Sequence, residues 1–124
     1  RFCQHCATYR QGVNIKVLAA GIGVTEQEYK ELLRLFVDTS GHELKMLICA
    51  LDRSDLAKAA EVAHSIKGAA MNLNLTALAE LGGAVEYAVK NRCFQDIDKV
   101  TGDMLRHINK LADLCDPEPQ KRRG

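Results

Sequence analysis

Three residues near the middle of the chain, His64, Lys67 and Gly68, bring together an imidazole, an ammonium group and a position without a side chain. Apolar residues recur around them every three or four positions, which predicts an amphipathic helix with one buried stripe. At about 100° per residue, His64 falls roughly 130° from the centre of that stripe, so we expect an accessible imidazole. Lys67 follows at the i+3 position, close enough to share a ligand with His64.

The helix face that carries His64 is poor in charge. Its other members are small or apolar, and they include Ala57, Ala60, Gly68 and Met71. Glycine in a helix interior costs about 1 kcal/mol relative to alanine, so we expect Gly68 to have a functional or a packing role there. An exposed imidazole with a neighbouring ammonium group and a flat surround indicates a surface that another protein approaches closely. We therefore regard Ala60 and Met71 as supporting residues of a candidate site.

Residues 64–73, His-Ser-Ile-Lys-Gly-Ala-Ala-Met-Asn-Leu, resemble the signature of histidine phosphotransfer (HPt) domains of two-component phosphorelays. That signature is His, any residue, Leu or Ile, Lys, Gly, two small residues, two variable residues, an aliphatic residue and usually Gly. Asn74 stands in the last place. Because asparagine is the next-best residue after glycine for a left-handed helix cap, we still expect the helix to end there.

The resemblance implies that His64 accepts a phosphoryl group from a receiver-domain aspartate, through Nε2, and passes it to another receiver aspartate. Phosphoryl transfer asks mainly for positioning and charge neutralisation, which Lys67 would supply as a point charge. Gly68 would leave room for the partner's loops. Glu86 occupies a position where such domains commonly carry Glu or Gln, and it would orient the other ring nitrogen. The implied partners are response-regulator receiver domains, including that of a hybrid sensor histidine kinase.

The sequence contains neither a P-loop nor a kinase-type glycine-rich loop, so we expect a phosphotransfer intermediate without ATP-dependent kinase activity of its own. We expect no cofactor and no metal in this chain; the resemblance implies that Mg²⁺ belongs to the receiver. The net charge is only +1, from 17 basic and 16 acidic residues, so we do not expect the chain to bind nucleic acid. No apolar run reaches membrane-spanning length, so we expect no direct membrane contact.

The chain has five cysteines, an odd number scattered along the sequence, which do not indicate a disulfide framework. Such cysteines are typical of the reducing cytoplasm, so we expect a cytoplasmic protein. We also expect the chain to be a monomer. Cys49 falls within an apolar helical pattern, and we expect its thiol to be buried.

Helices account for most of the chain. Thr25 and Glu28 form a capping box, which begins a long amphipathic helix. Residues 40–43, Ser-Gly-His-Glu, predict a break, with Ser40 as the cap of a second helix that ends near Asp52.

Ser54 or Asp55 then caps the helix that carries His64. After a turn over residues 73–75, Thr76 is expected to cap the next helix, which closes at residues 91–92. The last helix begins near Phe94 and continues past Leu111. Gly82 and Gly83 stand in mid-helix, where together they cost about 2 kcal/mol relative to alanine. We favour close packing against the His64 helix, over contact with a partner, as their reason.

We therefore predict an all-α fold: an antiparallel up-down-up-down four-helix bundle with an extra N-terminal helix that packs over one end of it. This short helix is indicated by Ile15, Val17, Leu18 and Ile22, and we expect Gly21 and Gly23 to break it. The expected organisation is a lead-in over residues 1–13, an HPt-like bundle over residues 14–115, and a disordered tail over residues 116–124.

Two other interpretations stay open. The first is the dimerisation and phosphoacceptor region of a histidine kinase, whose histidine is usually followed by an acidic residue, a basic residue and Thr-Pro, whereas Ser65-Ile66-Lys67-Gly68 follows here. The second is a non-catalytic helical adaptor or zinc-linked dimer organised around Cys3 and Cys6, which have the C-x2-C spacing of half a zinc site.

Overall fold

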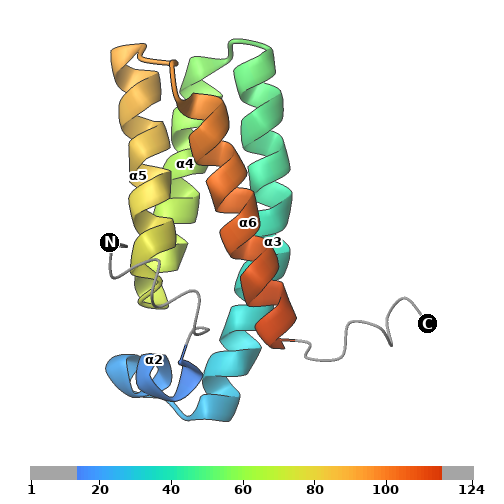
Figure 1. The fold of residues 1–124 in the computed structure, drawn as a ribbon, viewed down its shortest axis with the longest axis vertical. Helices are drawn as coiled ribbons and strands as arrows, with labels where there is room; N and C mark the ends of the chain where they lie inside the picture. Colours follow the sequence, from blue (N-terminus) through green and yellow to red (C-terminus); the bar gives the residue numbers. More distant parts are fainter. Residues whose placement is uncertain (1–13, 116–124) are drawn as a thin grey trace, which may run out of the picture.

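The structure, a computed structural model, describes residues 14–115. Five helices follow one another in this part of the chain, which contains no strand: α2 (Ile15–Ile22), α3 (Glu26–Asp52), α4 (Leu56–Asn72), α5 (Thr76–Asn91) and α6 (Ile97–Cys115). Figure 1 shows α3 to α6 standing side by side, each running back along the one before it, with α2 lying across the lower end. The all-α prediction is confirmed, and the arrangement fits the predicted bundle. The predicted lead-in, with Cys3 and Cys6, and the predicted tail lie outside the described residues.

Helix α3 is continuous through residues 40–43, so the predicted break is wrong. The apolar stripes on either side of this tetrapeptide are in phase, with buried Phe36 one turn before Ser40 and buried Leu44 one turn after it. Ser40 therefore falls on the core face and is only 1% exposed. One buried stripe along 27 residues outweighs the local preference of Ser and Gly for a helix end.

Cys49 is exposed, contrary to the expectation of burial. Its neighbours Leu47 and Ala50 are buried, and at about 100° per residue position 49 turns away from the core that both of them face. The apolar composition of the segment favours burial, but the position of Cys49 around the helix axis determines that its side chain is exposed.

Helix α4, which carries His64, is capped at both ends. Asp55 accepts a hydrogen bond from the backbone N–H of Lys58 at 3.2 Å, as predicted for its N-terminus. At the other end Asn74 adopts a left-handed conformation with φ 61°, and the N–H of Leu75 donates to the carbonyl of Ala70 at 2.9 Å. This is the helix stop expected of Asn74.

Two helix starts differ from their predictions. Thr76 is the first residue of α5 and not its cap; the N-cap is Leu75, without a side-chain capping bond. Helix α6 begins at Ile97, three residues after Phe94, because α5 ends in a left-handed Arg92 and the connection needs the residues between them. The predicted end of α5 at residues 91–92 is confirmed.

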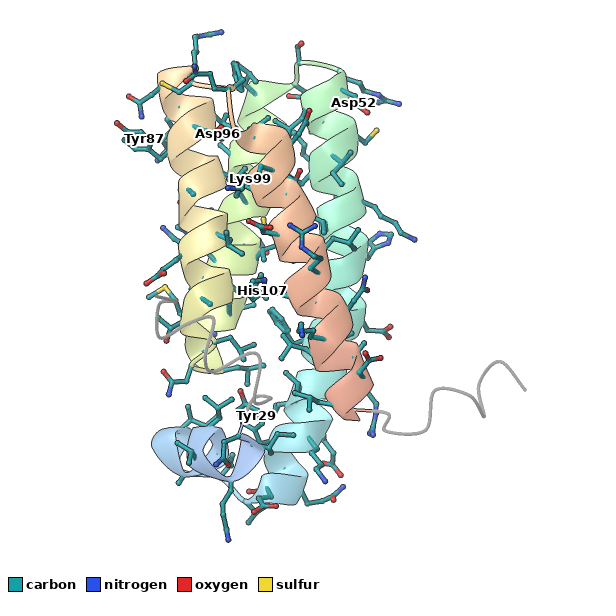
Figure 2. All side chains as sticks on the ribbon, viewed as in Figure 1. Tyr29, Asp52, Tyr87, Asp96, Lys99 and His107 are labelled. Carbon is teal, nitrogen blue, oxygen red and sulfur yellow. The ribbon has the colours of Figure 1, made fainter. Side chains whose placement is uncertain are left out.

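Long-range hydrogen bonds tie the lower end of the bundle together. The Tyr29 hydroxyl donates to the Leu73 carbonyl at 2.6 Å, which joins α3 to the α4–α5 turn beside α2, where Figure 2 labels Tyr29. Arg34 donates to the Cys115 carbonyl at 3.1 Å and so caps the end of α6. The first bond fixes the end of α4 and the second fixes the end of α6. The core face of α4 consists largely of alanines, which lets α3 and α5 pack closely on either side of it.

Candidate functional site

His64 lies on the outward face of α4, as the helical periodicity predicted. Its side chain is 68% exposed, whereas the neighbouring Ala63 and Ile66 are fully buried. The ring is held from one side only: Nδ1 lies 3.1 Å from Oε2 of Glu86 on α5. Among the described residues no hydrogen bond engages Nε2, which leaves this nitrogen without a protein partner on a largely exposed ring.

Glu86 is the centre of the site. Its side chain is only 13% exposed, and its Oε1 accepts a hydrogen bond from Lys67 Nζ at 2.9 Å. Lys90, one turn further along α5, places its Nζ 3.5 Å from Oε2. The hydrogen bond from Lys67, together with the charges of Lys67, Lys90 and His64, holds the pKa of Glu86 below its ordinary value, against the opposing effect of burial. Glu86 is therefore an ionised carboxylate at neutral pH.

This carboxylate fixes the state of the imidazole. An ionised carboxylate can only accept hydrogen bonds, so the ring nitrogen that faces Glu86 must carry the proton. In neutral His64 the lone pair then belongs to Nε2, the nitrogen directed toward solvent. The geometry thus presents an oriented nucleophile at the surface, with the Lys67 ammonium on the same carboxylate.

The short distance between α4 and α5 depends on Gly82. A Cβ at this position would lie 3.2 Å from Lys67 Cβ and 3.3 Å from the Lys67 backbone, which is closer than ordinary packing allows. The packing explanation therefore holds for Gly82. It does not hold for Gly83, where a Cβ would meet Lys67 Cδ at 3.5 Å, an ordinary van der Waals distance.

Gly68 has no packing role either. A Cβ built there meets nothing within 4 Å, so the open space beside His64 is a property of the surface. Ala60 is half-buried on the same face, and Met71 is 62% exposed. On the α3 side, Ser65 donates to Glu43 Oε2 at 2.7 Å. The predicted residues are therefore brought together on one face, with Glu86 supplied by the neighbouring helix.

Lys90 was not predicted as a residue of the site. Its spacing of four residues from Glu86 was an available signal, because such pairs lie on one helix face. Within residues 14–115, no group of three or more His, Cys, Asp or Glu side chains could hold a metal ion. None of the described helices has the length and apolar character needed to span a membrane.

Comparisons with known proteins agree on one family. The model of the family described as Hpt domain matches residues 31–116. Phosphotransferase RcsD of Escherichia coli (strain K12) is 31% identical over 77 residues, which are 62% of this chain and 9% of that protein. The chain thus spans less than a tenth of the length of this relative. The crystal structure of histidine-containing phosphotransfer protein B (HptB) from Pseudomonas aeruginosa PAO1 superposes with a TM-score of 0.72 and 30% identity, covering 87% of this chain and 94% of that one.

Proposed function

Because the chain belongs to the Hpt domain family, and so acts as a histidine phosphocarrier in a phosphorelay, we propose that His64 is the residue that carries the phosphoryl group. The observation that supports this assignment is the exposed imidazole whose Nδ1 lies 3.1 Å from the Glu86 carboxylate. Such a domain interacts with the receiver domains and histidine kinases of its relay. The partner therefore delivers its phosphoryl group to Nε2, the nitrogen that faces outward.

In the transfer, the Nε2 lone pair attacks the phosphorus of an aspartyl phosphate on the receiver. The bond from phosphorus to the aspartyl oxygen breaks, and its electron pair leaves on the receiver's carboxylate. The His64 ring becomes positively charged while Nδ1 keeps its proton, and the Glu86 carboxylate stabilises that charge. The reverse step regenerates the aspartyl phosphate from the same atoms.

Lys67 supports the charge on the transferred group. Its ammonium lies 2.9 Å from Glu86 and its side chain is 30% exposed, so it can turn from the carboxylate toward a phosphoryl group one helical turn away on His64. Stabilising spread negative charge is the main electrostatic task in this chemistry. Gly68 leaves the room that the receiver's loops need beside the ring.

The same proposal covers the chain's other properties. Residues 14–115 form the transfer unit, which uses no cofactor or metal of its own, with Mg²⁺ held by the receiver. It has no ATP-dependent kinase activity, binds neither nucleic acid nor membrane, and works as a cytoplasmic monomer. One chain supplies all four bundle helices, which favours this proposal over a kinase dimerisation region, where helical hairpins pair.

The assignment is tested with His64→Gln. Incubation with a phosphorylated receiver should give an acid-labile label in the wild-type protein and none in the variant, while thermal melting is unchanged because the side chain is exposed. His42→Gln is the matched control, an exposed histidine on α3 that should label normally. Retained acid-labile label in His64→Gln contradicts the assignment.

A further inference from the structure

A groove of about 490 Å³ opens directly beside Lys67, between the second half of α4 and the first half of α5. Its walls are mainly apolar and include Met71, Leu75 and Ala79, with Gly83 also lining it. The side chain of Met71 is 62% exposed, so a large apolar group stands in solvent at the rim. Methionine is flexible and adapts to the shape of a partner, and an exposed one beside an apolar groove favours binding.

The groove contains a glycine that the fold does not require. Gly83 lies inside α5, where glycine costs about 1 kcal/mol relative to alanine, and a Cβ there would make only an ordinary contact with Lys67. Gly68, on the other side of Lys67, is likewise without a packing role. The absence of a side chain therefore leaves space on both sides of Lys67: at Gly68, beside His64, and at Gly83, in the groove.

The groove is close enough to His64 to be covered by the same partner. Seven residues separate His64 from Met71 along α4, which is about 10 Å. A standard interface covers about 800 Å² on each partner, equivalent to a disc of about 16 Å radius. A receiver docked over His64 therefore also covers the groove, with which the site shares Lys67.

We propose that this groove receives an apolar side chain of the receiver domain and helps to determine which receivers dock. The proposal rests on the proposed function of His64. Lys67 and Glu86 act on the phosphoryl group and the imidazole, which are the same for every receiver, so they cannot distinguish one partner from another. Discrimination must come from contacts beyond the reacting atoms, and an adaptable apolar groove at the edge of the site provides one.

The test compares two variants of the groove. Met71→Gln removes the apolar rim at nearly constant size, and Ala79→Leu fills the groove while keeping it apolar. Leu105→Gln is the matched control, because Leu105 is 46% exposed on α6, which Figure 1 shows in front of α4 on the other side of the bundle. For each protein, the rate of transfer from a phosphorylated receiver is measured against receiver concentration. Labelling by phosphoramidate, a small donor that needs no docking, is measured in parallel.

We expect both groove variants to raise the KM for the receiver about tenfold, the size of effect expected when one well-packed apolar contact of an interface is lost. The rate at saturation, phosphoramidate labelling and thermal melting should stay as in the wild type, and Leu105→Gln should change nothing. A wild-type KM in Met71→Gln overturns the proposal. A wild-type chain that sediments as a dimer, and as a monomer in both variants, also overturns it, because the groove would then hold a second copy.

These failures are distinguishable from failure of the proposed function. If the groove variants transfer normally while His64→Gln cannot be labelled, only the role of the groove is wrong. If His64→Gln is labelled by the receiver like the wild type, the assignment of His64 is wrong, and the groove proposal that rests on it fails as well.

Discussion

Replacing Glu86 should slow phosphoryl transfer without preventing it. Glu86→Ala removes the acceptor of the His64 Nδ1–H, which lies 3.1 Å away, and the partner of Lys67 Nζ at 2.9 Å. Both ring nitrogens can then carry the proton, and the charge that forms on the ring during attack has no carboxylate beside it. Glu86→Gln keeps a carbonyl acceptor but removes the negative charge, so its effect should be intermediate.

The magnitude follows from the exposure of the groups. A hydrogen bond to a charged group contributes about 1.5–3 kcal/mol. Because the His64 ring is 68% exposed, water replaces part of the lost bond. We therefore expect a loss of about 1.5–2 kcal/mol in Glu86→Ala, which is about 10–30-fold in rate. For Glu86→Gln, which loses only the charge-assisted part of the bond, we expect about 3–10-fold.

The assay is single-turnover transfer from a phosphorylated receiver at saturating concentration, so that docking does not limit the rate. Glu61→Gln is the matched control: it removes the same charge three residues before His64, from a side chain that is 74% exposed and pairs with Lys58 at 3.9 Å. It should transfer at the wild-type rate. A Glu86→Ala protein that transfers within about twofold of the wild type would refute the orienting role.

Further changes separate packing from function. Gly68→Gln should fold with equal or slightly higher stability, by up to about 1 kcal/mol in thermal melting, yet slow transfer from a receiver, because its side chain enters open surface. Gly82→Ala should lower stability by up to about 2 kcal/mol, since overpacking of its Cβ against the Lys67 backbone costs about 1–3 kcal/mol and alanine recovers about 1 kcal/mol of helix propensity, whereas Gly83→Ala should raise it by up to about 1 kcal/mol in the same denaturant titrations. Because the pKa of Glu86 lies below its ordinary value of 4.5, its contribution to stability is complete above pH 4.5 and is lost as the pH falls through the lowered pKa. The stability difference between the wild type and Glu86→Gln should therefore shrink below pH 4.5, and a difference that grows there would contradict the ion-pair arrangement.

Much of the framework could be predicted from the sequence because it depends on local periodicity. The outward position of His64 follows from the phase of its helix, and the stop after α4 follows from the left-handed preference of Asn74. Both features are properties of a few consecutive residues. The family resemblance then supplied the chemistry that phase alone does not specify.

The errors occurred where a local signal competed with packing along a whole helix. Ser40 and Gly41 have the composition of a break, but the buried stripe of α3 passes through them, and Ser40 is buried with its hydroxyl unpaired among the described residues. Cys49 has an apolar neighbourhood in sequence but the wrong phase for burial. The burial of Ser40 and the exposure of Cys49 can be predicted only when the apolar residues of positions 26–52 are placed on one continuous helix.

The contact of Glu86 with the His64 ring was expected only from the family resemblance, whereas the sharing of this carboxylate between His64 and Lys67 could not be predicted, because it is set between helices. Glu86 reaches both His64 and Lys67 only because Gly82 lets α5 approach the Lys67 backbone. A side chain at position 82 would push the helices apart, and the carboxylate would move away from the imidazole. The difference between the two nitrogens of His64, one protonated toward Glu86 and one open to the partner, thus depends on a glycine that touches neither of them. Glycine at position 82 costs helix stability, but it allows the short distance between α4 and α5 at which Glu86 reaches the His64 ring.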